Sequence, residues 1–317
     1  MGKEKNLGLL EATNNPKSLI VKGIQRYEYI PIDFIKCQII KLNPEMLLNN
    51  TILDFRSLVN RETGEFKPKR VATYKNIKIT IADSGFIEFS GSIHKYLNDG
   101  IHNYNDFTYS DYKVALNRIY EDFKILPENM WIQNLEYGVN ITPPIKSSLI
   151  LNNCFLHKRQ TISYPINTKN GHFIQAEHKR NYYLKVYDKA KQYRPINNGL
   201  KGQEILRIEV KQIRWHKYRK NNINTLDDFN RCAKYIFIND LTNKWEELVF
   251  YNPLSNHSNF GEKYSNPNYW ISLLDKNLKT YYRHILNLRT ANSKSGGDIQ
   301  KSIKRLILDK IDYLNLN

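Results

Sequence analysis

The sequence predicts an α+β protein, in which an antiparallel sheet carries helices on one face and a helical region follows toward the C-terminus. The first observation is that stretches of alternating apolar and polar residues, typical of half-buried strands, recur along the first two-thirds of the chain. The second is that beyond Asn221 the apolar spacing becomes that of helices. We therefore expect an irregular segment at residues 1–30, a sheet domain at residues 31–222 and a helical region at residues 223–317.

The first half of the sheet domain contains several expected strands and two helices. The expected strands are Ile32–Leu42, Val71–Ile81, Phe86–Ser92, Met130–Thr142, Gln160–Ile166 and His172–Glu177. The second and third form a hairpin across the turn residues Asp83–Gly85. Thr108–Asp111 resembles a capping box that begins a helix, and a shorter helix is expected around Ile145–Leu151.

Two later stretches, Tyr182–Lys189 and Leu206–Lys211, alternate most clearly, and we expect them to pair as strands. Their outward-facing residues are Lys185, Tyr187, Lys189, Arg207, Glu209 and Lys211. One open face of the sheet then holds a tyrosine hydroxyl, several cations and a carboxylate. Such a set of groups suits a tyrosine that attacks a phosphodiester beside a bound metal ion.

The helical region is expected to contain helices at residues 226–250, 268–289 and 298–314. Thr225–Asp228 predicts the cap of the first of these helices. The last helix has an apolar stripe that leaves its basic residues near solvent.

The composition points to a polyanionic partner. The net charge is +17 and the sequence pI is about 9.5, values that favour nucleic-acid binding. The alternative is the coding bias of an AT-rich genome, which over-supplies Lys, Asn, Ile and Tyr. No apolar run is long enough for a membrane span, and the start has no signal-peptide pattern. The three cysteines have no metal-ligand or redox spacing, so we expect reduced thiols in a cytoplasmic protein.

Oxygen-bearing side chains on the expected strands indicate a divalent metal. Glu136 and Asn140 lie four residues apart on the polar face of one strand, and Glu209 lies on the polar face of another. Mg²⁺ and Mn²⁺ prefer such oxygen ligands. His94 and His102 follow the hairpin, and each could add one imidazole ligand or make a structural hydrogen bond instead.

A family resemblance is carried by five runs in order. These runs are Ile87–Tyr96, Asn98–Asn103, Asn134–Glu136, Tyr187–Lys189 and Leu206–Glu209. Over about residues 30–215 the chain resembles replication initiators of the filamentous-phage gene II type and related plasmid Rep proteins that work by rolling circles. The resemblance implies a Rep nuclease-like core and an endonuclease and strand transferase that nicks one DNA strand at a replication origin.

The resemblance also implies roles for single residues. Tyr187 corresponds to the nucleophile, while Glu136 and Glu209 would help to hold the metal. Plasmid relatives often carry an acidic residue where this chain has Asn140, and commonly a Glu where it has Gln192.

The expected chemistry follows from the lysines around the nucleophile. Lys185 and Lys189 would favour the phenolate of Tyr187 and lower its pKa by roughly 1–3. Lys189 would also protonate or stabilise the leaving 3′ oxygen, and the product would be a covalent 5′-phosphotyrosine. The metal set expected from these arguments is Glu136, Asn140, Glu209 and His94.

Basic and aromatic residues predict where DNA is held. Lys211–Lys220 mixes five cations with two aromatic rings, which can meet phosphates and stack on unpaired bases. The expected nucleic-acid-binding residues are Lys185, Arg207, Lys211, Arg214, Trp215, Lys217, Tyr218 and Arg219. A second basic patch, expected to recognise duplex origin DNA, contains Lys276, Lys279, Arg283, Arg289, Lys294, Lys301, Lys304 and Arg305.

The sequence thus predicts a rolling-circle initiator in the cytoplasm of a bacterial host cell. Its expected partners are single-stranded DNA, origin duplex DNA and the host helicase and polymerase. Two alternatives stay open: a non-catalytic protein that binds single-stranded DNA or RNA, and a transposase or mobilisation relaxase with the same tyrosine chemistry.

Overall fold

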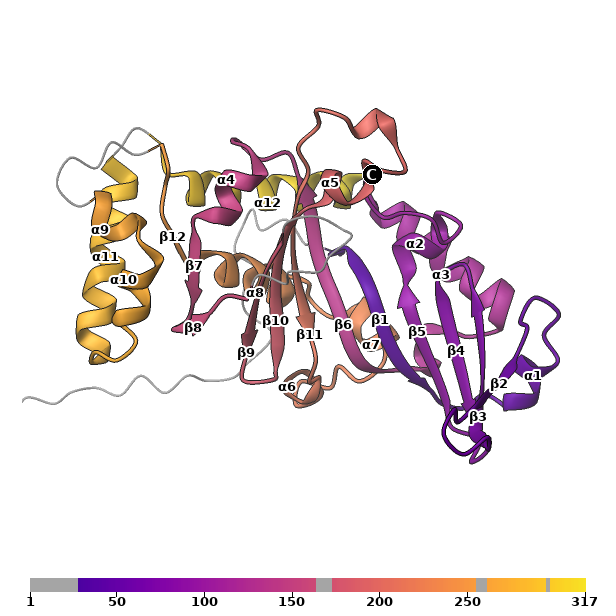
Figure 1. Cartoon of the computed structure of the whole chain (residues 1–317). Coiled ribbons are helices and arrows are strands. Elements are labelled where there is room, and N and C mark those ends of the chain that lie inside the picture. The colour runs from indigo at the N-terminus through magenta and orange to yellow at the C-terminus, as the bar shows by residue number, and fades with distance from the viewer. Residues whose placement is uncertain (1–27, 164–172, 255–260, 295–296) are drawn as a thin grey trace, which may run out of the picture.

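The computed structural model describes residues 28–163, 173–254, 261–294 and 297–317. Its main element is a sheet in the strand order β2-β3-β4-β5-β1-β6-β11-β10-β9, with every neighbouring pair antiparallel (Figure 1). The strands are β1 (Ile32–Ile39), β2 (Arg56–Val59), β3 (Phe66–Tyr74), β4 (Ile77–Ala82), β5 (Ile87–Ser92), β6 (Met130–Ile141), β9 (Phe173–His178), β10 (Tyr182–Asp188) and β11 (Leu206–Gln212). A small second sheet has the order β12-β7-β8, from β7 (Cys154–His157), β8 (Gln160–Thr161) and β12 (Leu248–Phe250).

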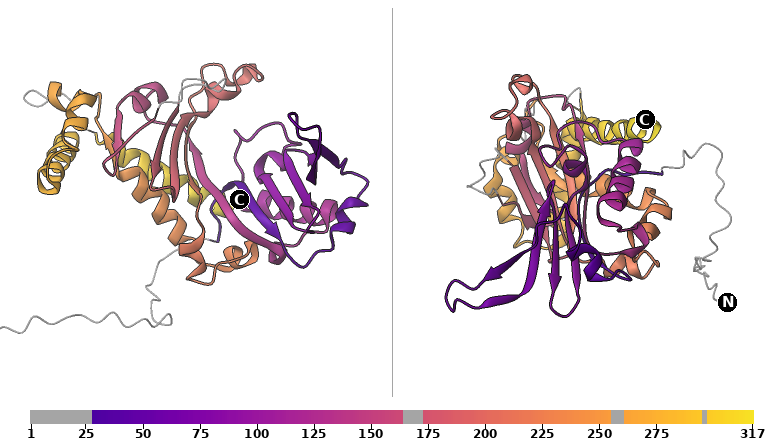
Figure 2. Two further views of the ribbon diagram at one scale, coloured as in Figure 1. Left: turned by 60° about the horizontal axis from the view of Figure 1, so that its bottom comes forward. Right: turned by 90° about the vertical axis from the view of Figure 1, so that its right-hand side faces the viewer.

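Helices pack on one face of the large sheet and leave the opposite face open (Figures 1 and 2). The helices before residue 222 are α1 (Pro44–Leu48), α2 (Ile93–Leu97), α3 (Tyr109–Phe123), α4 (Ser147–Asn152), α5 (Lys189–Tyr193) and α6 (His216–Arg219). The later helices are α7 (Leu226–Arg231), α8 (Tyr235–Glu246), α9 (Gly261–Ser265), α10 (Pro267–Ser272), α11 (Leu278–Lys294) and α12 (Ile299–Leu316). This architecture confirms the predicted α+β class.

Alternation along the central strands explains why helices cover only one face. In β6, Leu135, Tyr137 and Val139 are buried, and the ring of Tyr137 packs edge-on against Phe237 of α8 with centroids 5.4 Å apart. Helix α12 lies on the same side and buries Ile303, Ile307 and related residues in the same core. Burial of this continuous apolar surface is the main stabilising contribution of the fold.

Both predicted capping boxes are present. The hydroxyl oxygen of Thr108 accepts from the backbone N–H of Asp111 at 3.1 Å, and the Asp111 carboxylate accepts from the backbone N–H of Thr108 at 2.9 Å. Thr225 and Asp228 make the equivalent pair at the start of α7. Each box satisfies N–H groups that a helix leaves without partners at its N-terminus.

Several predicted element boundaries were wrong for identifiable reasons. The expected strand Val71–Ile81 is split between β3 and β4 by the turn at Lys75 and Asn76, which both have positive φ. No glycine marks this turn, so the alternation of apolar and polar residues does not reveal that the strand ends there. The expected helix 226–250 is interrupted between α7 and α8, where Nζ of Lys234 donates to three carbonyls, and its last residues, Leu248–Phe250, form strand β12 instead.

Other boundaries differ in the same way. The expected helix 268–289 is divided into α10 and α11, while the last predicted helix matches α12 closely. The expected strand Gln160–Ile166 ends at Thr161, and its remainder includes residues 164–166, which lie outside the described residues. The 1–30 segment also lies largely outside them, although Tyr29 and Ile30 are buried in the core.

The hydrophobic core extends past the expected domain boundary at residue 222. Helices α7, α8 and α12 contribute residues to the same core as the large sheet. A second, smaller core joins α10 and α11 to Leu156 of β7 and Val249 of β12. No helix of the described part of the chain is both long and apolar enough to cross a membrane.

The last helix is also tied to the beginning of the described chain. The side-chain oxygen of Asn315 accepts from the backbone N–H of Tyr29 at 2.8 Å, and its Nδ2 donates to the Tyr29 carbonyl at 2.9 Å. This pairing fixes the segment that leads directly into β1.

Candidate active site

Side chains on the open face of three neighbouring strands meet in one polar cluster. Strand β11 lies between β6 and β10, and the register places Lys185 opposite Glu209 and Lys211 opposite Glu136. Nζ of Lys185 lies 3.1 Å from Oε2 of Glu136 and 3.2 Å from Oε1 of Glu209. Nζ of Lys211 lies 2.7 Å from Oε1 of Glu136. The alternation in the sequence therefore predicted correctly which of these side chains share a face.

A glycine allows β6 and β11 to approach at this point. Gly138 lies between Glu136 and Asn140 on the same strand, and a Cβ built there would lie 2.2 Å from the carbonyl oxygen of Ile208 and 2.6 Å from Cα of Glu209. Any side chain at position 138 would therefore push β11 away and move Glu209.

The hydroxyl of Tyr187 lies between a carboxylate and an amine. It donates to Oε2 of Glu209 at 3.2 Å and accepts from Nζ of Lys189 at 3.3 Å. Burial and the negative charge of Glu209 raise the pKa of Tyr187 well above its usual value. The expectation that flanking lysines lower this pKa was wrong, because the ammonium of Lys185 is paired with Glu136 and Glu209.

Lys189 is a buried amine that releases its proton easily. It is the first residue of α5, directly after β10, and only 1% of its surface is exposed. Burial lowers the pKa of Lys189 to about 7, although the charge of Asp33 acts in the opposite direction. At neutral pH a substantial fraction of Lys189 is therefore uncharged and able to accept a proton.

A buried ion-pair network holds Glu209 in position. Nε of Arg207 lies 2.6 Å from Oε2 of Glu209, and Nη2 lies 3.3 Å from Oδ2 of Asp33. Burial alone would raise the pKa of Asp33, but the charges of Arg207 and Lys189 and the hydrogen bonds from Ser92 and Asn103 together outweigh it and hold this pKa well below its usual range. Lys185 and Arg207 likewise overcome the effect of burial on Glu209 and lower its pKa. Both carboxylates are therefore ionised at neutral pH.

Sequence reasoning missed the residues that complete this network. Oδ1 of Asp33 accepts from Oγ of Ser92 at 2.6 Å and from Nδ2 of Asn103 at 2.8 Å. The hydroxyl of Tyr193 donates to Oδ1 of Asn103 at 2.7 Å. One signal was available, since Asp33 is the only acidic residue in the apolar strand β1. Asn103 lies in a loop without periodicity and had none.

These side chains surround an open cavity of about 240 Å³. Its lining includes Glu136, Lys185, Tyr187, Lys189 and Glu209, together with Lys95 from α2, which sequence reasoning did not single out. The cavity thus combines a tyrosine hydroxyl, a proton acceptor and cations, the groups that phosphodiester cleavage by a tyrosine requires.

The expected metal ligands do not form a shared set of free donors. Glu136 and Glu209 are both paired with Lys185, whose ammonium lies where an ion bridging the two carboxylates would have to bind. Oδ1 of Asn140 accepts from Arg207 at 3.0 Å, and its Nδ2 donates to the carbonyl of Tyr104 at 3.1 Å.

His94 is also engaged elsewhere. It is 3% exposed, stacks on Phe107 with centroids 4.5 Å apart, and places Nε2 2.9 Å from Oδ1 of Asn105. Burial lowers its pKa to about 4. Among the described residues, no group of three or more His, Cys, Asp and Glu side chains is arranged to hold a metal. The arrangement therefore does not fit Mg²⁺ or Mn²⁺ bound by the four expected ligands.

Replacing Lys185 provides a direct test of this competition. We expect Lys185→Met to bind Mn²⁺ at least about tenfold more tightly than the wild type, because two facing carboxylates lose the cation between them. Titration calorimetry with Mn²⁺ in the absence of DNA measures this affinity. Lys36→Met removes a lysine paired with Glu88 on the same sheet and should leave Mn²⁺ affinity unchanged. Equal affinities of Lys185→Met and the wild type would contradict the prediction.

Two of the expected DNA-contacting rings are not available to bases. Trp215 and Tyr218 are each 2% exposed and pack against Phe237 of α8, with Trp215 also donating from Nε1 to the carbonyl of Ile223 at 2.8 Å. The prediction of base stacking on them was wrong because α6 turns both rings into the core. Arg207 is also buried, in the network that includes Asp33.

The cations of the same stretch differ in their exposure. Arg214 and Lys217 are exposed, and Arg219 is half-buried and donates to the carbonyl of Ile132 at 2.9 Å. Lys185 lines the cavity, and Lys211 on β11 pairs with Glu136, which also lines it.

In the second expected patch, several cations have acidic or carbonyl partners. Nζ of Lys304 lies 2.7 Å from Oε2 of Glu246, and Nζ of Lys301 lies 3.3 Å from Oδ2 of Asp298. Nη2 of Arg289 donates to the carbonyl of Glu246 at 2.8 Å. Nε of Arg305 lies 3.8 Å from Oδ2 of Asp309.

The remaining cations of that patch, Lys276, Lys279 and Arg283, are exposed on or near α11, while the side chain of Lys294 lies outside the described residues.

A scan against models of known protein families and a search of curated proteins both returned no match to this chain.

Proposed function

We propose that this protein is a rolling-circle replication initiator that nicks and rejoins one DNA strand through a covalent 5′-phosphotyrosine at Tyr187. The observation that supports the proposal best is the position of the Tyr187 hydroxyl between Lys189 and Glu209, in a cavity lined by further cations. A protein that only binds DNA has no need of a buried, low-pKa lysine beside a tyrosine hydroxyl.

The choice of proton acceptor follows from two lowered pKa values with different consequences. Glu209 is close to the phenol, but its lowered pKa makes it a weak base. Lys189 has a pKa of about 7, which matches proton transfer near neutral pH. We therefore assign Lys189 as the general base for Tyr187.

The proposed reaction balances without an added reactant. The Tyr187 hydroxyl turns its proton from Glu209 to the neutral Nζ of Lys189, 3.3 Å away, which takes it while the Tyr187 oxygen attacks phosphorus and the bond to the 3′ oxygen breaks. The resulting ammonium then gives its proton to the leaving 3′ oxygen, which departs as a hydroxyl. The phosphodiester is replaced by a phosphotyrosine ester, so the reverse attack by a 3′-hydroxyl rejoins the strand.

Charge on the phosphate is met by the chain's own cations. Lys95 and Lys185 line the same cavity as Tyr187 and are proposed to hold the non-bridging oxygens as negative charge develops. Mg²⁺ or Mn²⁺ belongs to the proposal only as an ion that would have to displace Lys185 from Glu136 and Glu209.

The wider setting is proposed from the same reaction. Single-stranded DNA is the substrate, and the exposed cations near α11 are proposed to contact origin duplex DNA. In the cytoplasm of a bacterial host cell, the host polymerase would extend the free 3′-hydroxyl while the host helicase separates the strands.

The experiment that tests the proposal looks for the covalent intermediate. The protein is incubated with labelled single-stranded DNA from its own replicon, with EDTA or with added Mg²⁺ or Mn²⁺, and separated on a denaturing gel. A labelled band at the mass of the protein supports the proposal. Tight, salt-sensitive binding without any such band in all three conditions would favour a non-catalytic binding protein.

Lys189 predicts how the reaction depends on pH. Deprotonation makes it a base, so we expect the rate of adduct formation to rise about tenfold between pH 6 and pH 8, with a midpoint near the pKa of about 7. Lys189→Met should slow the reaction by about 10²–10³-fold at pH 8 and remove this dependence. Single-turnover gel assays measure both effects, with the exposed neighbour Lys191→Met as the control. An unchanged profile in Lys189→Met would reject Lys189 as the base.

A further inference from the structure

A second cavity, of about 590 Å³, lies away from Tyr187. Its walls come from the β7–β8 turn, the β9–β10 turn, the end of α8 and helix α11. Four cations line it, Lys158, Arg159, Lys179 and Arg289, together with His178, whereas Glu247 is its one carboxylate. We call this cavity the basic groove.

The two hairpin turns of the basic groove have an unusual backbone. Lys158 and Arg159 form the two-residue turn between His157 and Gln160, and both have positive φ, 47° and 64°. Lys179 and Arg180 occupy the central positions of the β9–β10 turn, again with positive φ, 49° and 54°.

Such turns ordinarily take Asn-Gly, because residues with a Cβ are strained in the left-handed region. Both turns instead carry a Lys-Arg pair, of which Lys158, Arg159 and Lys179 line the groove. The strain is unfavourable for folding, which points to a functional reason for the two charged pairs.

The inner wall of the groove holds an arginine with spare hydrogen-bonding capacity. The guanidinium of Arg159 lies 5.1 Å from the ring centroid of Tyr281, and its Nη2 donates to the carbonyl of Leu274. Its Nη1 is buried and has no hydrogen-bond partner in the part of the chain that the structure describes. A buried donor of this kind is suited to an acceptor oxygen from a ligand.

Aromatic groups accompany the cations. Tyr281 is 3% exposed and supports Arg159, whereas Tyr282 on the same wall packs edge-on against Tyr281 and is 56% exposed. His178 stacks on Tyr182 with centroids 5.2 Å apart. Cations and an exposed aromatic ring in the wall of one groove match a ligand that alternates phosphates and planar bases.

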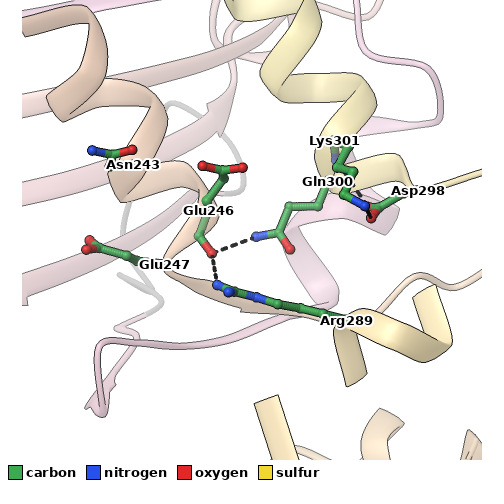
Figure 3. A pocket seen from close by; sticks show the side chains of 7 residues that line it. All are labelled: Asn243, Glu246, Glu247, Arg289, Asp298, Gln300 and Lys301. Atoms are coloured by element: carbon green, nitrogen blue, oxygen red, sulfur yellow. Dashed lines mark hydrogen bonds and ion pairs between the residues drawn. The ribbon is translucent and has the colours of Figure 1, made fainter. Parts of the chain in front are cut away.

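A neighbouring cavity shows what distinguishes the basic groove. This cavity, of about 430 Å³, shares Arg289 with the basic groove. Its lining carries three carboxylates, Glu246, Glu247 and Asp298 (Figure 3). In Figure 3, Arg289 and Gln300 both reach the backbone carbonyl of Glu246, which anchors α11 and α12 to the end of α8. Its mixed charge makes it unsuitable for a polyanion, whereas the same anchored Arg289 gives the basic groove a fixed wall.

From these observations we infer that the basic groove binds a segment of single-stranded nucleic acid, at a site separate from the cavity around Tyr187. Bases that stay stacked inside a duplex offer no face to the exposed ring of Tyr282, so a single strand suits the groove better than a duplex. Tyr182 beside the groove points to the helix-covered face, whereas Tyr187 points to the open face, five residues or about 17 Å farther along β10. A nucleotide bound at Tyr187 therefore lies outside the basic groove.

Replacing one strained turn tests the inference without risking the fold. The variant Lys179→Asn/Arg180→Gly removes the groove cation Lys179 and its neighbour Arg180, and it supplies the residues that such a turn prefers. We expect its midpoint of thermal unfolding to rise by roughly 2–4 °C. We also expect about tenfold weaker binding of a labelled oligothymidylate, with a salt slope smaller by about 1.4. Fluorescence anisotropy at several salt concentrations measures both binding quantities.

A matched control removes the same charge elsewhere. Lys113→Gln/Arg118→Gln neutralises two exposed cations on α3 and should change binding less than twofold. All variants are compared in a Tyr187→Phe background, so that covalent chemistry contributes nothing to the signal. A loss of groove binding then supports the inference even if no covalent adduct exists in the wild type.

Three results would overturn the inference. The first is oligothymidylate binding by the Lys179→Asn/Arg180→Gly variant within twofold of its parent. The second is an equal loss in the α3 control, which would show a general charge effect. The third is loss of duplex binding alone, which would assign the groove to a different ligand.

Discussion

Tyr187→Phe is expected to abolish the covalent protein–DNA adduct and to reduce strand cleavage by at least about 10³-fold. The substitution removes one oxygen, which is the proposed attacking atom. Its loss costs the fold two long hydrogen bonds, to Glu209 at 3.2 Å and from Lys189 at 3.3 Å, so the variant should remain folded. The denaturing gel with labelled single-stranded DNA measures the adduct, and thermal unfolding checks the fold.

The matched control for this experiment is Tyr183→Phe. Tyr183 lies on the same strand, but the register places it opposite Lys211 and Glu177 and four residues from Tyr187. Its adduct yield should equal that of the wild type. An adduct that survives in Tyr187→Phe would keep the tyrosine chemistry but move the nucleophile to another residue, for which Tyr193 beside Asn103 is the next candidate.

Arg207→Met is expected to lower the free energy of unfolding by about 3–5 kcal/mol. Arg207 is 2% exposed and pairs with both Asp33 and Glu209, so its removal leaves Asp33 without its ion-pair partner and Glu209 with Lys185 alone. Because small domains are stable by only about 5–15 kcal/mol, the loss would be a large share of the total. Urea unfolding followed by circular dichroism measures it.

An exposed arginine supplies the comparison. Arg305 is paired with Asp309 at 3.8 Å, and its side chain is 85% exposed. Arg305→Met should change the free energy of unfolding by less than about 0.5 kcal/mol. A loss below about 1 kcal/mol in Arg207→Met would mean that water or a rearranged lysine replaces the arginine, and that the network does not hold the site together.

The strands and their outward faces were predictable because the physics involved is local. Alternation in Tyr182–Lys189 and Leu206–Lys211 records which side of the sheet is buried, and the pairing register then places Tyr187 beside Glu209. The capping boxes at Thr108 and Thr225 are local in the same sense. Each depends on residues only a few positions apart.

The rest of the site depended on contacts that no short pattern records. Asn103 reaches Asp33 from a loop 70 residues away in the sequence. The pKa values of Tyr187 and Lys189 depend on burial, which a strand pattern does not reveal for residues on an open face. Trp215 looked like a base-stacking ring because the turn that buries it, α6, is only four residues long.

The bond between Asn315 and Tyr29 has a consequence for the order in which the chain folds. Helix α12 lies against β6, the central strand that carries Glu136, and it also fixes the segment that leads into β1. These contacts join residues 286 positions apart, so closing them carries a large entropic cost and is slow. During synthesis the ribosome adds α12 after every strand of the sheet. The packing of α12 against β6 can therefore form only after translation has passed α12.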